Sequence, residues 1–273
     1  MKTVILHPTT ALKVEAVCAQ LPHALLLSGA KGVGLSTIAH YITTHTKTKG
    51  SIISINPDEK GTISIDTIRQ LYTQTRTKQS TLQITIINDA DSMGQEAQNA
   101  LLKLLEEPSS NTAFILTTHA PSKLLPTIHS RLQELLVQPI TKKQAEDFLT
   151  ELGVSDAKTR AQIQFIAPGL PAEMYRLHSD DDYFNLQAET AREARQLLSG
   201  KPYEKLLIIQ KYSANREKVL ELLQHSMHIV EYSLTQKANS ALAGQLRKLL
   251  ETEATIRENA NTKIQLLKLV ISV

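Results

Sequence analysis

The sequence predicts an α/β fold with a mostly parallel sheet, followed by a part that contains only helices. Up to about residue 138, short apolar segments alternate with amphipathic helical segments, an order typical of a parallel sheet covered on both faces. A glycine-rich loop joins the first apolar segment directly to a helical one. After Pro139 the pattern contains no further strand, and only helical periodicity continues.

The strands predicted in the first part are short and apolar, as buried parallel strands are. They cover residues 23–27, 51–55, 82–87 and 113–118. Predicted helices cover residues 36–42 and 65–75, and the second turns inward its residues Ile65, Ile68, Leu71 and Tyr72.

A further helix is predicted after Ser92, because Ser92 and Gln95 have the spacing of a capping box. Pro108 ends this helix, and a turn at residues 109–111 leads to the next strand. Its inward face consists of small and branched apolar side chains, namely Ala97, Ala100, Leu101, Leu104 and Leu105.

In the second part, Thr141 and Gln144 form another capping box, which opens a helix to about Leu152. Ser155 is predicted to cap the next helix, and a Pro-Gly turn precedes a short one at residues 173–178. The acidic residues 180–182 are interpreted as a solvated linker rather than a metal loop, because no further ligands accompany them.

The last 90 residues are predicted to form long amphipathic helices. They cover residues 186–198, 203–212, 216–234 and 241–270. The final helix carries an apolar stripe that consists of Leu246, Leu249, Leu250, Ile256, Ile264, Leu267 and Val270.

Composition limits the classes of function. The 273 residues allow two or three domains, and 41% hydrophobic with 21% charged residues is ordinary for a globular protein. Aromatic residues make up 4%, without Trp, which disfavours base-stacking platforms. A net charge of +3 permits contact with nucleic acid, but an ordinary solvated surface explains it better.

Cys18 is the only cysteine, which excludes an internal disulfide and a multi-cysteine zinc site. It is predicted to be a buried thiol on an apolar helix face with Leu12, Ala16 and Ala19. No apolar run approaches the ~18 residues that span a bilayer, and residues 1–7 are too short for a signal peptide. We therefore expect no membrane contact and a cytoplasmic location.

The glycine-rich loop, residues 29–36, reads GAKGVGLS and has the outline of a phosphate-binding loop. The lysine that would reach the β- and γ-phosphates is replaced by Leu35, and Lys31 lies inside the loop, where it cannot substitute. The loop alone fits a plain strand-to-helix connection equally well. Polar residues that include Asn88, Asp89 and Asp91 follow the strand at 82–87, where Mg²⁺ ligands belong in nucleotide-binding α/β folds.

Together these segments resemble the AAA+ clamp-loader family, in particular the delta-prime type of bacterial DNA polymerase III. The resemblance rests on residues 87–91 (INDAD), 98–108 (QNALLKLLEEP), 111–116 (NTAFIL) and 124–131 (LLPTIHSR). It is weaker over the glycine loop, residues 65–69 and the turn at 169–171, and the last 90 residues match only in helical character. The implied domains are a RecA-like AAA+ α/β domain with a degenerate P-loop (1–138), a small helical lid (139–182) and a helical collar for oligomerisation (183–273).

The resemblance also implies a degenerate nucleotide site. Asn88 takes the place of the Mg²⁺-binding Walker B aspartate, Asp89 that of the catalytic glutamate, and Thr118 that of sensor one. Ala172 falls near the place where motor subunits of the family carry a sensor-two arginine. The degenerate P-loop consists of Gly29, Gly32, Gly34, Leu35, Ser36 and Thr37.

Three of these departures remove charge that stabilises phosphoryl transfer, namely Leu35, Asn88 and Ala172. ATPase activity of the chain by itself is therefore not expected. Nor is a cofactor expected in its own site, since ATP and Mg²⁺ would be bound by the neighbouring subunit. The four-cysteine zinc module of many family members is excluded, so no zinc is expected.

Arg131 carries the chemistry that the resemblance implies. The family's Ser-Arg-Cys motif supplies an arginine finger to ATP on the neighbouring subunit, and this chain reads Ser130-Arg131-Leu132. The alternative is an ordinary surface arginine in an ion pair.

The predicted function is a non-hydrolysing, stator-like subunit of the clamp loader, and thus a component of the polymerase holoenzyme. Implied partners are the motor (gamma/tau) and delta subunits and, through the complex, the sliding clamp and primed DNA. Two alternatives stay open: a divergent motor subunit that still hydrolyses ATP, and a stand-alone AAA+ adaptor in recombination or repair.

Overall fold

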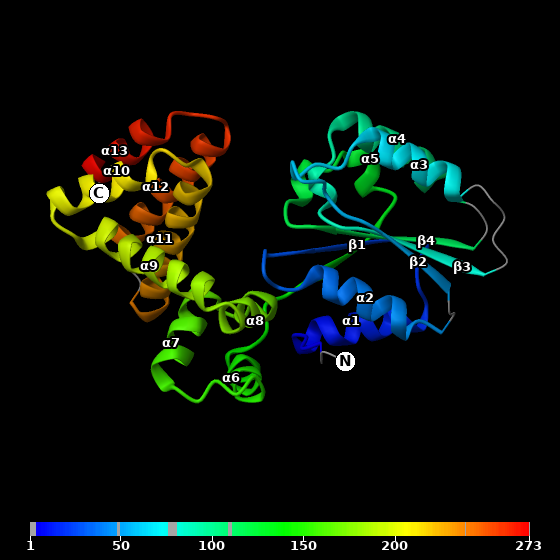
Figure 1. Ribbon diagram of the computed structural model, residues 1–273, viewed down its shortest axis with the longest axis horizontal. Coiled ribbons are helices and arrows are strands. Elements are labelled where there is room, and N and C mark those ends of the chain that lie inside the picture. Colours follow the sequence, from blue (N-terminus) through cyan, green and yellow to red (C-terminus); the bar gives the residue numbers. More distant parts are fainter. Residues whose placement is uncertain (1–3, 48–49, 76–80, 109–110, 238, 273) are drawn as a thin grey trace. The chain divides into compact units, whose positions relative to one another are not determined.

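The computed structural model describes residues 4–47, 50–75, 81–108, 111–237 and 239–272. The chain forms two compact units, Met1–Arg176 and Leu177–Val273. The first unit contains the sheet and its surrounding helices, and the described part of the second contains only helices (Figure 1). Most of the segment predicted as a lid, residues 139–182, belongs to the unit that contains the sheet.

The sheet has five strands in the order β2-β3-β4-β1-β5, and every pair is parallel. The strands are β1 (Ala24–Gly29), β2 (Gly50–Ile55), β3 (Leu82–Ile87), β4 (Thr112–Thr118) and β5 (Gln133–Val137). The α/β class and the four predicted strands are confirmed. The edge strand β5 was not predicted, because it begins with two polar residues and only Leu135 and Val137 are buried.

The described part of the first unit also contains nine helical elements that lie wholly within it. They are α1 (Pro8–Ala19), α2 (Leu35–His45), α3 (Ile65–Thr75), α4 (Gln95–Glu106), α5 (Pro126–His129), α6 (Lys142–Glu151) and α7 (Ala157–Ile166), with the short 3-10 helices η1 (Ala90–Ser92) and η2 (Pro121–Lys123). Helix α8 (Pro171–Ser179) begins in the first unit and ends in the second.

The two faces of the sheet are covered by different helices (Figure 1). Leu25 and Leu27 of β1 pack in an apolar cluster with residues of α1 and α2. Leu26 points to the opposite face and packs with residues of α3 and α4. Because successive side chains of a strand alternate between faces, a strand covered on both sides must be continuously apolar. Each of these three leucines is fully buried.

Two of the predicted helix caps are wrong. Helix α4 begins at Gln95 after Gly94, and Ser92 instead ends η1, with its hydroxyl buried and without a hydrogen-bond partner in the described chain. Helix α7 is capped by Asp156, which accepts from the Thr159 N–H at 2.7 Å, rather than by Ser155. The capping box at Thr141 is confirmed. Of the predicted turn at 109–111, residues 109 and 110 lie outside the described residues.

The apolar face predicted for the first helix is also wrong. Helix α1 buries Thr10, Val14 and Val17, whereas Leu12 is exposed. Ala16 and Ala19 are exposed as well, and Cys18 is half-buried at the margin of the cluster under α1. Partial burial, and after it the neighbouring Glu15, raise the pKa of the Cys18 thiol, so this thiol is a poor nucleophile.

The second unit is built from α9 (Asp181–Ser199), α10 (Pro202–Tyr212), α11 (Arg216–Gln236), α12 (Ser240–Arg257) and α13 (Thr262–Ser272). The acidic residues predicted as a linker open α9, because Asp180 caps it by accepting from the Tyr183 N–H. Among the described residues, no group of three or more His, Cys, Asp or Glu side chains could hold a metal ion.

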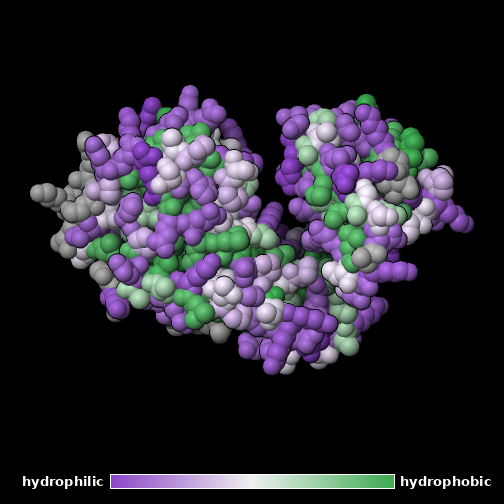
Figure 2. All heavy atoms as spheres, turned by 180° about the vertical axis from the view of Figure 1, so that it is seen from behind, coloured by the Kyte–Doolittle hydropathy of each residue, from purple (hydrophilic) through white to green (hydrophobic). Residues whose placement is uncertain are grey.

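The last predicted helix is in fact two, because the chain turns at Asn259, whose φ is 70°. The predicted apolar stripe is only partly correct, because the turn changes the helical phase of the residues after Asn259 and because Leu250 lies on the exposed face of α12. Leu249 and Ile256 are buried, but Leu250 and Ile264 are exposed. Figure 2 shows hydrophobic residues scattered among hydrophilic ones on the face that it draws. None of the described helices is long and apolar enough to cross a membrane.

Candidate functional site

The glycine-rich loop connects β1 to α2, and two of its glycines have left-handed backbone conformations. Gly32 and Gly34 have φ values of 87° and 95°, a region that glycine adopts without strain. Ser36 lies in the first turn of α2, as does Thr37. Leu35 is 2% exposed and packs in the apolar cluster beneath the loop with Val33. The position where a P-loop has its phosphate-binding lysine therefore belongs to the core.

Ser36 and Asn88, the P-loop and Walker B positions, are joined directly. The Ser36 hydroxyl donates to Oδ1 of Asn88 at 2.7 Å, and the Asn88 amide donates to Oδ1 of Asn56 at 2.8 Å. Asn88 is 6% exposed. A serine hydroxyl and a carboxylate at these positions would be Mg²⁺ ligands, but here a neutral amide uses its oxygen for the serine. The donor set therefore fits a hydrogen-bonded chain better than a divalent cation.

His119, which the sequence analysis missed, spans the carboxyl ends of two strands. Its Nδ1 lies 2.9 Å from the carbonyl oxygen of Gly29, and its Nε2 lies 3.6 Å from Oδ1 of Asp89. Asp89 has a φ of 48°, and its N–H donates to Thr117 Oγ1. The histidine thus joins the start of the glycine loop to Asp89, the residue predicted to take the place of the catalytic glutamate. The position of His119 directly after Thr118 was the sequence signal that could have identified it as a site residue.

Thr118, at the predicted sensor-one position, is fully buried and donates to Oδ1 of Asp91 at 2.8 Å. The backbone N–H of His119 points to the same carboxylate oxygen at 3.3 Å. The polar group after β3 is therefore divided: Asn88 faces Ser36, while Asp91 faces the end of β4.

The beginning of α8 lies directly on the glycine loop. The N–H groups of Ala172 and Glu173 donate to the carbonyl oxygen of Gly32 at 3.0 and 3.1 Å. A Cβ atom on Gly32 would lie 2.7 Å from the Cβ of Glu173, and one on Gly34 would lie 3.6 Å from the Cβ of Ala172. Helix α8 and the loop are therefore in van der Waals contact, and Ala172 lies beside Gly34.

Arg131 follows α5, and its guanidinium has three partners. Nη2 lies 2.7 Å from Oε1 of Glu106, and Nη1 donates to the Thr127 carbonyl oxygen at 2.8 Å and to Ser130 Oγ at 3.3 Å. The Arg131 side chain is 36% exposed. These partners belong to α4, α5 and the residue after it, so the structure does not bring Arg131 to the chain's own glycine loop.

Two polar side chains, one buried and one exposed, fix the segment that carries Arg131. Gln98, which is 3% exposed, donates from Nε2 to the carbonyl oxygens of Met93 and Lys123 and accepts from the Leu125 N–H at 2.8 Å. Glu134 accepts from the Ser28 hydroxyl at 2.6 Å, and its other oxygen lies 3.5 Å from Nε2 of His129. Both η2 and α5 are thus tied to α4 and to the sheet.

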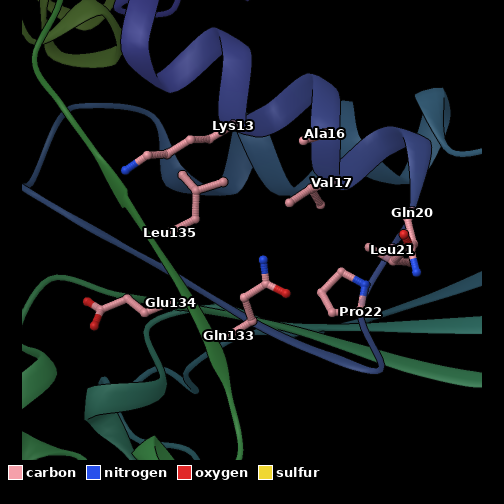
Figure 3. A pocket seen from close by; sticks show the side chains of 9 residues that line it. All are labelled: Lys13, Ala16, Val17, Gln20, Leu21, Pro22, Gln133, Glu134 and Leu135. Atoms are coloured by element: carbon pink, nitrogen blue, oxygen red, sulfur yellow. The ribbon is translucent and has the colours of Figure 1, made fainter.

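A surface cavity of about 580 Å³ lies between α1 and β5. Figure 3 shows Lys13 and Val17 of α1 on one side and Gln133 and Leu135 of β5 on the other. None of the site residues predicted from the sequence lines this cavity, so the cavity gives no support to a nucleotide function.

Comparison with known proteins finds similarity over part of the chain. A family model described as DNA polymerase III, delta subunit, matches residues 44–141. DNA polymerase III subunit delta' of Bacillus subtilis is 38% identical over 107 residues, which cover 39% of this chain and 32% of the relative. The delta' subunit of Pseudomonas aeruginosa is 28% identical over 186 residues, 59% of this chain and 57% of the relative.

The fold has a counterpart among solved structures. A DNA polymerase III gamma subunit-related protein from Thermotoga maritima aligns with 96% of this chain and 97% of its own, with a TM-score of 0.55 and 17% identity. That likeness supports the predicted fold class, an AAA+ sheet domain followed by helices. The chain spans between a third and somewhat over half of the curated relatives' lengths. By its matches, the chain is similar over part of its length to the delta-prime subunits of DNA polymerase III.

Proposed function

We propose that the chain is a non-hydrolysing, stator-like subunit of a clamp loader, and that it acts on ATP bound by a neighbouring subunit. The observation that carries the proposal is the pairing of Ser36 with Asn88. Two side chains that would share Mg²⁺ in a working site bind each other instead. The partner oxygen is that of an uncharged amide, which contributes no negative charge to hold the metal.

Two further features support an inactive site. Leu35 is part of the core, so the loop has no cation at the position that reaches the β- and γ-phosphates. The contact of Ala172 and Glu173 with Gly32 holds α8 against the loop through protein groups alone. We infer that the lid keeps its place on the sheet domain without ATP, as a stator requires, and that no nucleotide cofactor is needed.

Arg131 is the proposed point of action. It lies on the surface at the end of α5, and a guanidinium can bind phosphate oxygens bidentately. The proposed role implies two direct partners of this chain, a motor subunit of gamma/tau type and a delta subunit. The sliding clamp and primed DNA would be engaged through the complex. Such a complex operates in the cytoplasm.

We expect the isolated protein to show no ATP turnover at saturating ATP and Mg²⁺, because neither the lysine nor the metal-binding carboxylate is present. A phosphate-release assay measures this, with the cognate motor subunit as the positive control. Turnover that Ser36→Ala abolishes would show a working site in this chain and would favour the divergent motor instead.

The second unit is proposed as the collar through which the subunits assemble. Its helices bury their own apolar cluster, yet several large apolar side chains stay on the surface, and exposed apolar area marks interaction surfaces. The most exposed of them in this unit, outside the last turn of α13, are Tyr203, Leu206, Leu207, Tyr232, Leu250 and Ile264.

Removal of residues 183–273 is expected to leave a folded sheet domain that no longer joins the complex. The first unit has its own two apolar clusters on the faces of the sheet, which supports independent folding. Circular dichroism checks the fold, and co-elution with the motor and delta subunits checks assembly. A truncated chain that co-elutes as well as the full chain would contradict the collar assignment.

A further inference from the structure

The ion pair between Glu106 and Arg131 joins the last residue of α4 to the residue two positions after α5. Both side chains are well exposed, 48% for Glu106 and 36% for Arg131. Ion pairs at this exposure contribute little to folding stability, because water and salt screen them. The consequence of this pair is therefore to be sought in the position that it gives to the guanidinium.

The guanidinium is held from two sides. Glu106 engages Nη2, while Thr127 and Ser130 engage Nη1. A free arginine side chain samples many rotamers, and fixing it costs conformational entropy. Of its five N–H donors, these three contacts leave two for another acceptor.

The elements that carry the pair are themselves fixed. Gln98, on the same helix as Glu106, binds the backbone of Lys123 and Leu125 just before α5. The start of α5 is therefore tied to the first turn of α4 by the hydrogen bonds of a buried side chain, which are stronger constraints than surface contacts. Glu106 then acts from a rigid base.

We propose that Glu106 is a positioning residue that orders the Arg131 guanidinium before the neighbouring subunit is bound. The inference rests on the proposed function, in which Arg131 acts in trans. Electrostatic stabilisation of a transition state depends on groups that are already in place when charge develops. An arginine ordered beforehand reaches the phosphate without losing rotamer freedom during turnover.

The test uses the complex reconstituted from the full chain with its cognate motor and delta subunits, the sliding clamp and primed DNA. Glu106→Gln keeps the size and removes the charge, and we expect it to lower the stimulated kcat for ATP by up to about fivefold. The KM for ATP stays unchanged, because the neighbour's own loop binds the nucleotide. Glu106→Asp, which keeps the charge on a shorter side chain, restores part of the rate.

Glu107→Gln is the matched control, because it removes the same charge one residue further along. Glu107 is exposed, and its side chain makes no ion pair among the described residues; we expect the wild-type rate. In an Arg131→Ala background, Glu106→Gln is expected to change nothing further, because there is no guanidinium to position. Equal elution profiles confirm that all complexes are assembled.

Three results would overturn the inference. The first is a rate for Glu106→Gln equal to that of Glu107→Gln, and the second is a faster rate, which would make Glu106 a competitor for the guanidinium. The third is an equal loss with and without Arg131. If Arg131→Ala slows the complex and Glu106→Gln does not, only the role of Glu106 fails. If Arg131→Ala itself has no effect, the proposed function fails with it.

Discussion

Replacement of Arg131 with alanine is expected to slow ATP hydrolysis at the adjoining motor site by ~10³–10⁵, the range over which arginine fingers act. The physical reason is the loss of a permanent positive charge that lies at the subunit surface and has donors free for phosphate oxygens. The measurement is the clamp- and DNA-stimulated ATPase rate of the reconstituted complex. In a complex with several motor sites, single-turnover kinetics isolate the affected one.

Two comparisons make this result specific. Arg131→Lys keeps the charge but not the planar, bidentate group, so it is not expected to restore the rate. Folding and assembly should be unaffected, since loss of an exposed ion pair costs at most about 1 kcal/mol. Equal rates for the wild-type and Arg131→Ala complexes, at equal assembly, would leave Arg131 as an ordinary surface arginine paired with Glu106.

The parts of the fold that could be predicted are those in which burial is complete. The first four residues of β1, 24–27, are all apolar because helices cover both faces of the strand, so the sequence alone indicates a buried parallel strand. β5 lies at the sheet edge with three of its five residues exposed, and its polar start hides the strand. The division of α12 from α13 could not be predicted from the sequence either, because the left-handed residue at the turn is Asn259 rather than a glycine.

The candidate site divides in the same way. The absence of a lysine at Leu35 and of an aspartate at Asn88 can be read directly, because sequence position defines both roles. The hydrogen-bond partners of the site residues could not be predicted from the sequence, since no local pattern links residues so far apart in the chain. Gly29 is 90 residues from His119, and Ser36 is 52 from Asn88.

Stability should also depend on pH through one buried histidine of the second unit. His225 on α11 is 7% exposed, and its Nε2 lies 2.8 Å from the side-chain Oε1 of Gln187 on α9. Burial, and after it the nearby His228, lowers the pKa of His225 to about 4 from its usual 6.5. The neutral ring therefore donates its Nε2 proton to Gln187, and the charged ring is disfavoured in the folded state.

The direction of the effect follows from the proton balance. Between pH 6.5 and 4 the unfolded chain binds a proton that the folded chain does not, so the free energy of unfolding falls as the pH falls. The contribution of the neutral His225 to the free energy of unfolding is complete above pH 6.5 and is lost by about pH 4, an amount of roughly 3 kcal/mol.

Urea unfolding of the full chain at pH 7, 6, 5 and 4 measures this contribution, with His225→Gln as the comparison because that side chain does not titrate. We expect the difference between the two unfolding free energies to shrink or change sign as the pH is lowered, because only the wild type loses this term. Parallel pH profiles would mean that His225 accepts its proton in the folded state as readily as in the unfolded one.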